Sequence, residues 1–393
     1  RGNVMVSSVL TKLVRPLRSA AFLEALLGHF APAAGAAPSR ATKMPSDLAS
    51  LRPTNEGEER DKFFAALESG PSYEPQLRYA DPGRAERVRA ECDKHLSTEF
   101  EAMSKAVLEG IISDHQTEER YQESVWCPTI DAQEAVEKMC GEYVSANALA
   151  GKVDFVWSPE TLVTMCTGSR VLLVTRPGYY RERRLSSLLD HEVGTHLVRS
   201  HNHKQAFPRS VERRTWADKA SGWLLATEEG LATLNTHRGY TDKRFWIPAL
   251  HYHAALLASR LPFSQLWHEL SAFQEPSRPR SWTTCLRVKR GVADTGQPGG
   301  YYKVKDQSNF CGALRLLQAR ATIDFKLLHA ARVSLEDLPR ALPAARRAVN
   351  QGMDVLLPSF VRDEAAYRQA LEEMAVANGL EGSTGGPTRM EVG

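Results

Sequence analysis

The chain has 393 residues, of which 42% are hydrophobic and 25% charged, and its 50 basic and 47 acidic side chains give a net charge of +3. This is the composition of a globular protein with a sizeable core, and the length suggests two or three structural units. No apolar run approaches the roughly 20 residues of a membrane helix, which excludes a membrane span. The six cysteines form no C-x-x-C pair, which argues against a disulfide scaffold and a cysteine zinc site.

The charge is unevenly distributed along the chain. Residues 1–46 carry +5, residues 176–220 carry +5 and residues 276–305 carry +6, which leaves −13 for the remainder. The near-neutral total therefore conceals three basic segments, and their positions matter more than the sum. No nucleic-acid-binding motif accompanies them, so we expect no nucleic-acid partner.

Residues 1–46 form a basic N-terminal segment that ends in an Ala/Pro/Gly/Ser linker. Its arginines and serines and its scarcity of acids are typical of a mitochondrial transit peptide. A disordered segment, or the remnant of an upstream region, is the simpler interpretation of the same composition. We therefore predict a disordered or targeting segment here.

Residues 47–378 show apolar side chains at three- and four-residue spacing, which predicts one predominantly helical domain. Residues 153–157 and 170–175 are the expected strands, and 282–302 is expected to be extended or looped. The tail at 379–393 is rich in Gly, Ser and Thr, which predicts disorder. The expected helices cover 56–67, 85–113, 130–150, 187–200, 221–235, 248–259, 263–273, 310–328, 337–351 and 363–378.

The most informative motif is H-E-V-G-T-H at His191–His196. Zinc peptidases carry H-E-x-x-H, in which two histidines on one helix face ligate zinc and the glutamate, here Glu192, activates a bound water. The second histidine here lies five residues on, which at about 100° per residue leaves the imidazoles roughly 140° apart on a regular helix. A one-residue bulge would bring them together, and the backbone freedom of Gly194 would ease that distortion.

A second motif, T-E-E-G-L-A at Thr227–Ala232, supplies a candidate third ligand. Two histidines and one carboxylate leave the fourth zinc position for water. We predict that Glu229, next to Gly230, is the ligand, and that Glu228 contacts either the ligands from behind or a substrate amine. Acid pairs are usually exposed, so the metal site follows only from the combination of the two motifs.

Together with further blocks, these motifs resemble the microtubule-associated tyrosine carboxypeptidases and, more distantly, bacterial proteins named for a Q-E-G-L-A motif. One such block begins with L-R-P-T-N at Leu51–Asn55, and another begins with C-x-R-x-K-R-G at Cys285–Gly291. The resemblance extends over residues 50–375, with the blocks in order. Two departures, Asn309 where the family usually has tyrosine and the run Tyr301–Lys303, bear on the substrate pocket.

The resemblance implies one zinc ion on His191, His196 and Glu229, with Glu192 as general base. It also implies an α+β, predominantly helical, zincin-like metallopeptidase domain with a small β-sheet beside the active-site helix. The implied activity is removal of the C-terminal tyrosine of α-tubulin, which makes the tubulin tail and microtubules the partners. The expected location is cytoplasmic, on the cytoskeleton, with mitochondrial targeting by the N-terminal segment as an open alternative.

An enzyme that acts on a C-terminus needs a cation to hold the free carboxylate. The planar fork of arginine matches a carboxylate best, so Arg287 and Arg290 are the first candidates for substrate binding. Lys303 and Arg199 are further candidates.

Two other functions remain open at this stage. A zinc aminopeptidase, or a zinc peptidase of another specificity, would use Glu228 to hold a free amine. A non-catalytic microtubule-binding scaffold is the alternative of another class, and the intact Glu192 argues against it. The chain carries no Walker loop, no G-x-S-x-G and no dinucleotide fingerprint.

Overall fold

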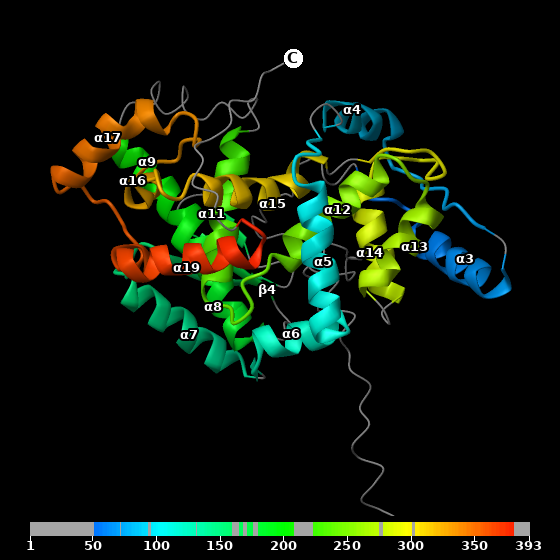
Figure 1. Cartoon of the computed structure of the whole chain (residues 1–393), viewed down its shortest axis with the longest axis horizontal. Coiled ribbons are helices and arrows are strands. Elements are labelled where there is room, and N and C mark those ends of the chain that lie inside the picture. The colour runs from blue at the N-terminus through cyan, green and yellow to red at the C-terminus, as the bar shows by residue number, and fades with distance from the viewer. Residues whose placement is uncertain are drawn as a thin grey trace, which may run out of the picture.

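Helices make up most of the described chain, as its periodicity predicted (Figure 1). The basic segment at 1–46 and residues 381–393 lie outside the described residues. No described helix combines the length and the apolar character that a membrane crossing requires. The computed structural model describes residues 51–70, 72–92, 96–130, 132–158, 165–167, 171–175, 180–207, 223–274, 278–300 and 303–380.

The elements follow one another along the chain as a series of helices interrupted by five short strands in the described residues. The first part comprises α3 (Glu56–Ser69), α4 (Pro82–Cys92), α5 (Glu101–His115), α6 (Glu118–Trp126), β1 (Thr129–Ile130), α7 (Gln133–Ala146), β2 (Asp154–Ser158), β3 (Met165–Thr167), β4 (Val171–Thr175) and β5 (Tyr180–Arg181). The second part comprises α8 (Glu182–His191), the π-helix η2 (Glu192–Leu197), α9 (Val198–Ala206), α11 (Trp223–Arg238), α12 (Trp246–Ala258), α13 (Phe263–Gln274), α14 (Arg278–Lys289), α15 (Lys303–Gln318), α16 (Phe325–Ala330), α17 (Leu338–Asn350), α18 (Ser359–Arg362) and α19 (Glu364–Ala377).

Two small sheets accompany the helices. β4 is the middle strand of the first, with β2 parallel to it and β3 antiparallel. β1 and β5 form the second as an antiparallel pair, with Ile130 opposite Tyr180. Because β5 runs directly into α8, this pairing fixes where α8 begins. The expected strands correspond to β2 and β4, whereas β1, β3 and β5 are too short to produce a recognisable alternation.

The helices α8, η2 and α9 follow one another without a break and lie between the two larger of the three hydrophobic cores of the described residues. Leu185, Leu189, Val193 and Leu197 recur every four residues and are at most 1% exposed. They pack in the smaller of these two cores, which includes residues of α7, whereas α11 packs against α8 and η2 and contributes to the larger core. The same four-residue stripe therefore turns His191 and His196 towards α11.

Helix α11 is pressed closely against α15 because both carry glycine at the crossing. A methyl group on Gly230 would overlap the backbone of Gly312, and one on Gly312 would overlap the carbonyl of Ala226. The requirement for close approach explains why glycine follows Glu229 in the T-E-E-G-L-A motif. It also brings Asn309 of α15 to the side of Glu229.

The single helix expected over residues 85–113 is wrong, since α4 and α5 are separate. Ahead of α5, backbone N–H groups have tertiary partners in place of helical ones. Ser97 N donates to Gln307 Oε1 at 2.8 Å and Phe100 N donates to the Tyr252 hydroxyl at 3.3 Å. Contacts that are distant in sequence thus override the local helical period.

Three further expectations need correction. Residues 310–328 are divided between α15 and α16, because the side chain of Asp324 caps α16 by accepting from Leu327 N. The expected loop at 282–302 begins instead with helix α14, whose threonines bond to carbonyls four residues earlier. Within the expected disordered tail, Leu380 is 6% exposed and packs in the larger core.

The glycine contact predicts a large effect of a small substitution. We expect Gly230→Ala to lower the free energy of unfolding by about 1–3 kcal/mol or more, because the added methyl group meets backbone that cannot rotate away. Urea unfolding followed by circular dichroism measures the change. Gly141→Ala in α7 is the matched control, since no atom lies within 4 Å of the position that its methyl group would take. The control should be neutral or stabilising by about 0.5–1 kcal/mol.

Candidate metal centre and adjoining pocket

The bulge that the H-E-x-x-x-H spacing predicted is present. Glu192–Leu197 form a π-helix between α8 and α9. The extra residue in this turn compensates for the five-residue interval, and the rings of His191 and His196 lie 4.9 Å apart between centroids. In a regular helix the two imidazoles would point in different directions. The π-helix instead presents both of them on one side.

Gly194 contributes to the bulge for a different reason than the one expected. It is not among the glycines with positive φ, so its backbone freedom is not what the turn requires. A methyl group there would lie 2.5 Å from the Tyr143 hydroxyl and 3.0 Å from Phe360 Cε1. Glycine is needed because these two side chains pack directly against the π-helix.

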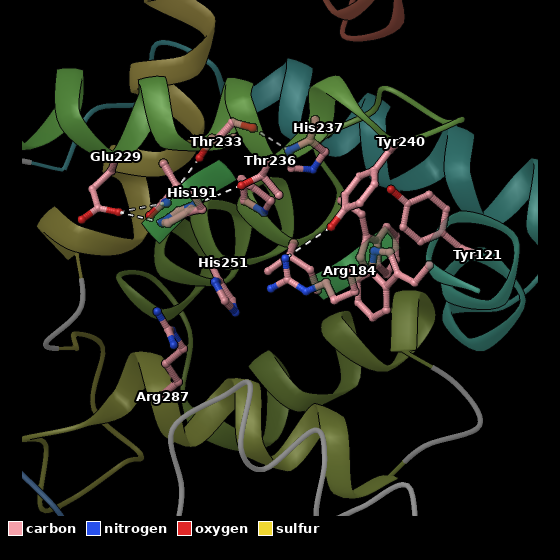
Figure 2. Close-up of a pocket in the computed structure, with 15 residues that line it drawn as sticks. Tyr121, Arg184, His191, Glu229, Thr233, Thr236, His237, Tyr240, His251 and Arg287 are labelled. Carbon is pink, nitrogen blue, oxygen red and sulfur yellow. Dashed lines mark hydrogen bonds and ion pairs between the residues drawn. The ribbon is translucent and has the colours of Figure 1, made fainter. Parts of the chain in front are cut away.

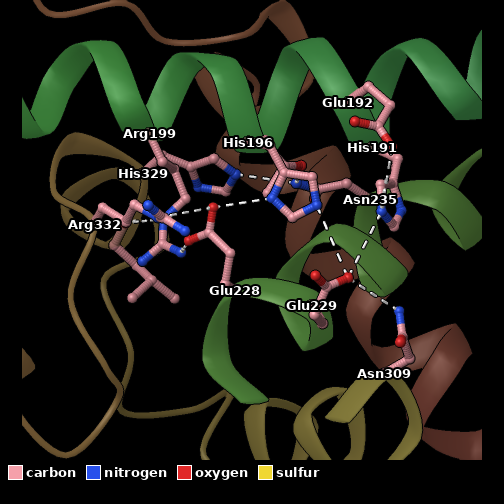
Figure 3. A network of polar contacts seen from close by, with 12 residues as sticks. His191, Glu192, His196, Arg199, Glu228, Glu229, Asn235, Asn309, His329 and Arg332 are labelled. Carbon is pink, nitrogen blue, oxygen red and sulfur yellow. Dashed lines mark hydrogen bonds and ion pairs between the residues drawn. The ribbon is translucent and has the colours of Figure 1, made fainter. Parts of the chain in front are cut away.

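Glu229 completes the predicted ligand set. One nitrogen of each histidine and one Glu229 oxygen all lie within 4.8 Å of one another. Glu229 Oε2 is 4.0 Å from His191 Nε2 and 3.9 Å from His196 Nε2 (Figure 3). Two imidazoles and one carboxylate converging on one point fit a divalent ion such as zinc, with a fourth position left for water.

The second nitrogen of each imidazole is already engaged. His191 Nδ1 lies 3.0 Å from Thr236 Oγ1, and His196 Nδ1 lies 2.9 Å from Glu228 Oε1. Because a carboxylate only accepts, His196 donates from Nδ1, which leaves the lone pair on Nε2 free for a metal. These partners fix the orientation of both rings towards Glu229.

Glu228 lies behind His196 and is buried, with 2% of its surface exposed. Burial alone would raise the pKa of Glu228, but the Arg199 guanidinium and the hydrogen bond from His196 hold the pKa well below its usual value. Arg332 adds a further contact at 3.4 Å. Glu228 therefore orients the metal-ligand candidate His196 and does not face a substrate.

Arg199 is fully buried and holds Glu228 in place. Its remaining N–H groups donate to the carbonyls of Leu328, Ala331 and Val333 at 2.9–3.1 Å. This guanidinium is thus occupied on all sides by the protein (Figure 3). The expectation that Arg199 could hold a substrate carboxylate is wrong.

Glu192 lies next to the ligand set without belonging to it. Its Oε1 is 4.0 Å from His191 Nε2, and its side chain is 16% exposed. A carboxylate at this position can exchange protons with a water that reaches the three ligands.

A pocket of about 230 Å³ opens beside the ligand set (Figure 2). This is smaller than the 300–1,000 Å³ typical of drug-sized ligands and suits a single side chain. One wall is a single face of α11, formed by Glu229, Thr233, Thr236 and His237, and Tyr240 extends it just beyond the end of the helix. The other walls come from α6, α8, α12, α14 and α15.

The predicted carboxylate-binding residues fall in different places. Arg287 lines the pocket, and Asp306 orients it through contacts of 2.7 and 2.9 Å from Nη2 and Nε. Arg290 is 9% exposed and does not line this pocket. The side chain of Lys303 lies outside the described residues, as do Tyr301 and Tyr302.

Asn309, the departure noted in the sequence, reaches the ligand set itself. Its Nδ2 lies 3.4 Å from Glu229 Oε2 and 3.3 Å from Thr233 Oγ1. Sequence reasoning missed Thr236 and Arg184, which also line the pocket. Helical periodicity from Glu229 would have indicated Thr236, but no local signal sets Arg184 apart from Arg181 and Arg183 beside it.

Comparison with known proteins finds close relatives of one kind, while no family model matches the chain. A Homo sapiens protein named microtubule-associated tyrosine carboxypeptidase 1 is 31% identical over 364 residues, which cover 91% of this chain and 73% of that protein. The Mus musculus protein of the same name is 30% identical, with 91% and 74% covered. A second Mus musculus protein, named putative tyrosine carboxypeptidase MATCAP2, is 28% identical, with 85% and 62% covered.

The buried ion pair predicts coupled effects on stability. We expect Arg199→Met to lower the free energy of unfolding by about 3–5 kcal/mol, because Glu228 stays buried without its main countercharge. The double variant Arg199→Met/Glu228→Gln should lose less than the sum of the single losses. Urea unfolding at pH 7 measures the losses for Arg199→Met, for Glu228→Gln and for the double variant. Arg340→Met, at a side chain 71% exposed, is the control and should change stability by no more than about 0.5 kcal/mol. Strictly additive losses would contradict the coupling.

Proposed function

The chain belongs to the microtubule-associated tyrosine carboxypeptidase family, and from this premise we propose that it is a zinc peptidase that removes the C-terminal tyrosine of α-tubulin. The observation that carries the proposal is the convergence of His191, His196 and Glu229 within 4.8 Å beside a pocket for one side chain. The names of the relatives state a tyrosine carboxypeptidase activity. The geometry of the site and these names support the same chemistry.

The residues of this chain divide the work of hydrolysis between them. His191, His196 and Glu229 would hold zinc, which when bound lowers the pKa of a coordinated water and polarises the scissile carbonyl. Glu192 takes the proton of the attacking water and returns it to the leaving amine. Glu228 and Thr236 keep the imidazoles in the orientation that this arrangement requires.

The pocket supplies what a carboxypeptidase needs beyond hydrolysis. Arg287 presents a guanidinium to the pocket, and Asp306 fixes its direction, so it is suited to grip the free carboxylate of a C-terminal residue. His251 lies in the same pocket, and its buried Nε2 has no hydrogen-bond partner among the described residues. A substrate carboxylate between Arg287 and His251 would satisfy both groups (Figure 2).

The aminopeptidase alternative requires Glu228 to receive a free amine. Glu228 is 2% exposed and is bonded to His196 and Arg199, so it has no face to offer a substrate. Glu192 beside a complete ligand set disfavours a non-catalytic scaffold, which has no use for a general base.

The proposed partner is the acidic tail of α-tubulin on microtubules, which places the protein on the cytoskeleton. Two of the basic segments, 176–220 and 276–305, carry α8 and α14, and both helices border the pocket. A positive rim would attract a glutamate-rich tail towards the site.

This attraction predicts a dependence on salt. We expect kcat/KM for a glutamate-rich peptide ending in tyrosine to fall several-fold between about 0.05 and 0.5 M salt, because the Debye length shortens from above 10 Å to a few Å. A peptide with the same last two residues and a neutral upstream sequence is the control and should change little. Equal salt dependence of the two peptides would contradict steering by the rim.

The catalytic assignment predicts a separation of metal binding from turnover. Wild-type protein should hold about one zinc per chain, and His191→Ala should lose it, because one of three ligands is gone. Glu192→Gln should keep the zinc and lose at least about 10²-fold in kcat, because the general base is gone. Metal analysis and mass spectrometry of the α-tubulin tail measure both.

His201→Ala is the matched control, because His201 belongs to the same helical segment but bonds to the carbonyl of Asp354 at 2.9 Å. It should keep both zinc and activity. The proposed reaction would be rejected if the α-tubulin substrate lost an N-terminal residue or were cleaved internally. It would also be rejected if Glu192→Gln kept full turnover.

A further inference from the structure

The pocket has two distinct ends, because α8 and α11 run along it in opposite directions. His191, at the end of α8, contacts Glu229 and Thr236 of α11. Arg184 lies seven residues earlier on α8 and contacts Tyr240 beyond the end of α11. Seven helical residues span about 10 Å. One end therefore carries the ligand set and the other carries Arg184 (Figure 2).

The end that holds Arg184 is aromatic. Tyr121, Trp126, Tyr240 and Trp246 line it. The Arg184 guanidinium lies over the Trp126 ring, 5.4 Å from its centroid, and its Nη1 donates to the Tyr240 hydroxyl at 3.3 Å. Such contacts hold a guanidinium in one orientation and leave other N–H groups for a ligand.

The acid nearest this end, Asp242, is paired with Arg244. Among the described residues no carboxylate pairs with Arg184, whereas the other arginine of the pocket, Arg287, is paired with Asp306. Burial and the nearby Arg184 lower the pKa of His237 to about 4, so this histidine is neutral at pH 7. The buried Nε1 of Trp126 also has no partner among the described residues. The aromatic end thus presents N–H groups of Arg184 and Trp126 to which an oxygen of a ligand can bond.

We propose that Arg184 is a specificity-determining residue that donates a hydrogen bond to the phenol oxygen of the substrate's C-terminal tyrosine. The inference rests on the proposed function. The scissile carbonyl and the free carboxylate both lie close to the last peptide unit, so they occupy the end with the ligand set and Arg287. The side chain extends away from that unit, and a flat ring fits between the aromatic walls with its hydroxyl at Arg184.

The assignment distinguishes tyrosine from phenylalanine. When the hydroxyl is absent, the partly buried guanidinium of Arg184 is left without this acceptor. Such a loss lowers the binding affinity more than the loss of a methylene contact does. We expect peptides ending in tyrosine to bind about 10- to 100-fold more tightly than the same peptides ending in phenylalanine. Removal of Arg184 should abolish most of this preference.

A double-mutant cycle between protein and peptide tests the proposal. In the zinc-loaded Glu192→Gln background, which does not consume the peptide, dissociation constants are measured with and without Arg184→Met. The peptides are an α-tubulin-like acidic tail that ends in tyrosine, in phenylalanine or in tyrosine amide. Arg184→Met should bring tyrosine and phenylalanine peptides within about threefold of each other. Arg287→Met should instead reduce the preference for the free acid over the amide.

Two variants keep the result interpretable. Arg183→Met, an exposed neighbour on α8, should leave all preferences unchanged. Arg184→Lys keeps the charge but not the planar fork and should give an intermediate preference. Equal weakening of tyrosine and phenylalanine peptides by Arg184→Met would show that Arg184 binds the carboxylate or backbone, and would overturn the proposal. So would a wild-type site that binds both peptides alike.

The proposed function can fail independently of this inference. If the zinc-loaded wild type cleaves no peptide, the proposed function is wrong, while the binding cycle still decides the role of Arg184. If the wild type cleaves but Arg184→Met leaves the ratio of kcat/KM for tyrosine and phenylalanine peptides unchanged, the proposed function stands and the role of Arg184 is rejected.

Discussion

The five-residue interval between His191 and His196 is the constraint on which the site depends. Only a turn with an extra residue lets both imidazoles face α11, and η2 provides it. The hydroxyl of Thr195 donates to the carbonyl of Asp190 at 2.8 Å and accepts from Asn235 Nδ2 at 2.7 Å. The π-helix is therefore tied by hydrogen bonds to the helix that carries the third ligand, and the two motifs form one unit.

Buried charges support this unit from two sides. Behind His196, Glu228 is held by Arg199, which in turn binds three carbonyls. At the other end of the turn, Asp190 accepts from the Tyr143 hydroxyl at 2.9 Å. Buried ions are costly unless every group has a partner, and here each partner also fixes a residue beside a ligand. The paired buried charges thus hold the residues beside the ligands in one geometry. Binding of a metal and of a transition state both require such a fixed geometry.

Sequence reasoning predicted the parts of the site that are set by local spacing. The motif residues, the bulge and the choice of Glu229 follow from helical geometry and ligand chemistry. Gly194 was singled out for backbone freedom, whereas its contacts with Tyr143, distant in sequence, are what demand glycine. Arg184 could not be identified, because its significance comes from Trp126, which belongs to another helix. The division of residues 85–113 was missed for the same reason, since tertiary partners end the helix.

The position of a bound metal tests the central claim most directly. Crystals of the zinc-loaded protein, measured at the zinc absorption edge, locate the ion by anomalous scattering. The geometry of the ligand set predicts one ion about 2.0–2.2 Å from Nε2 of His191, Nε2 of His196 and an oxygen of Glu229, with η2 intact. An ion bound by Glu228, or a regular helix through His191 and His196 with no shared ion, would contradict it.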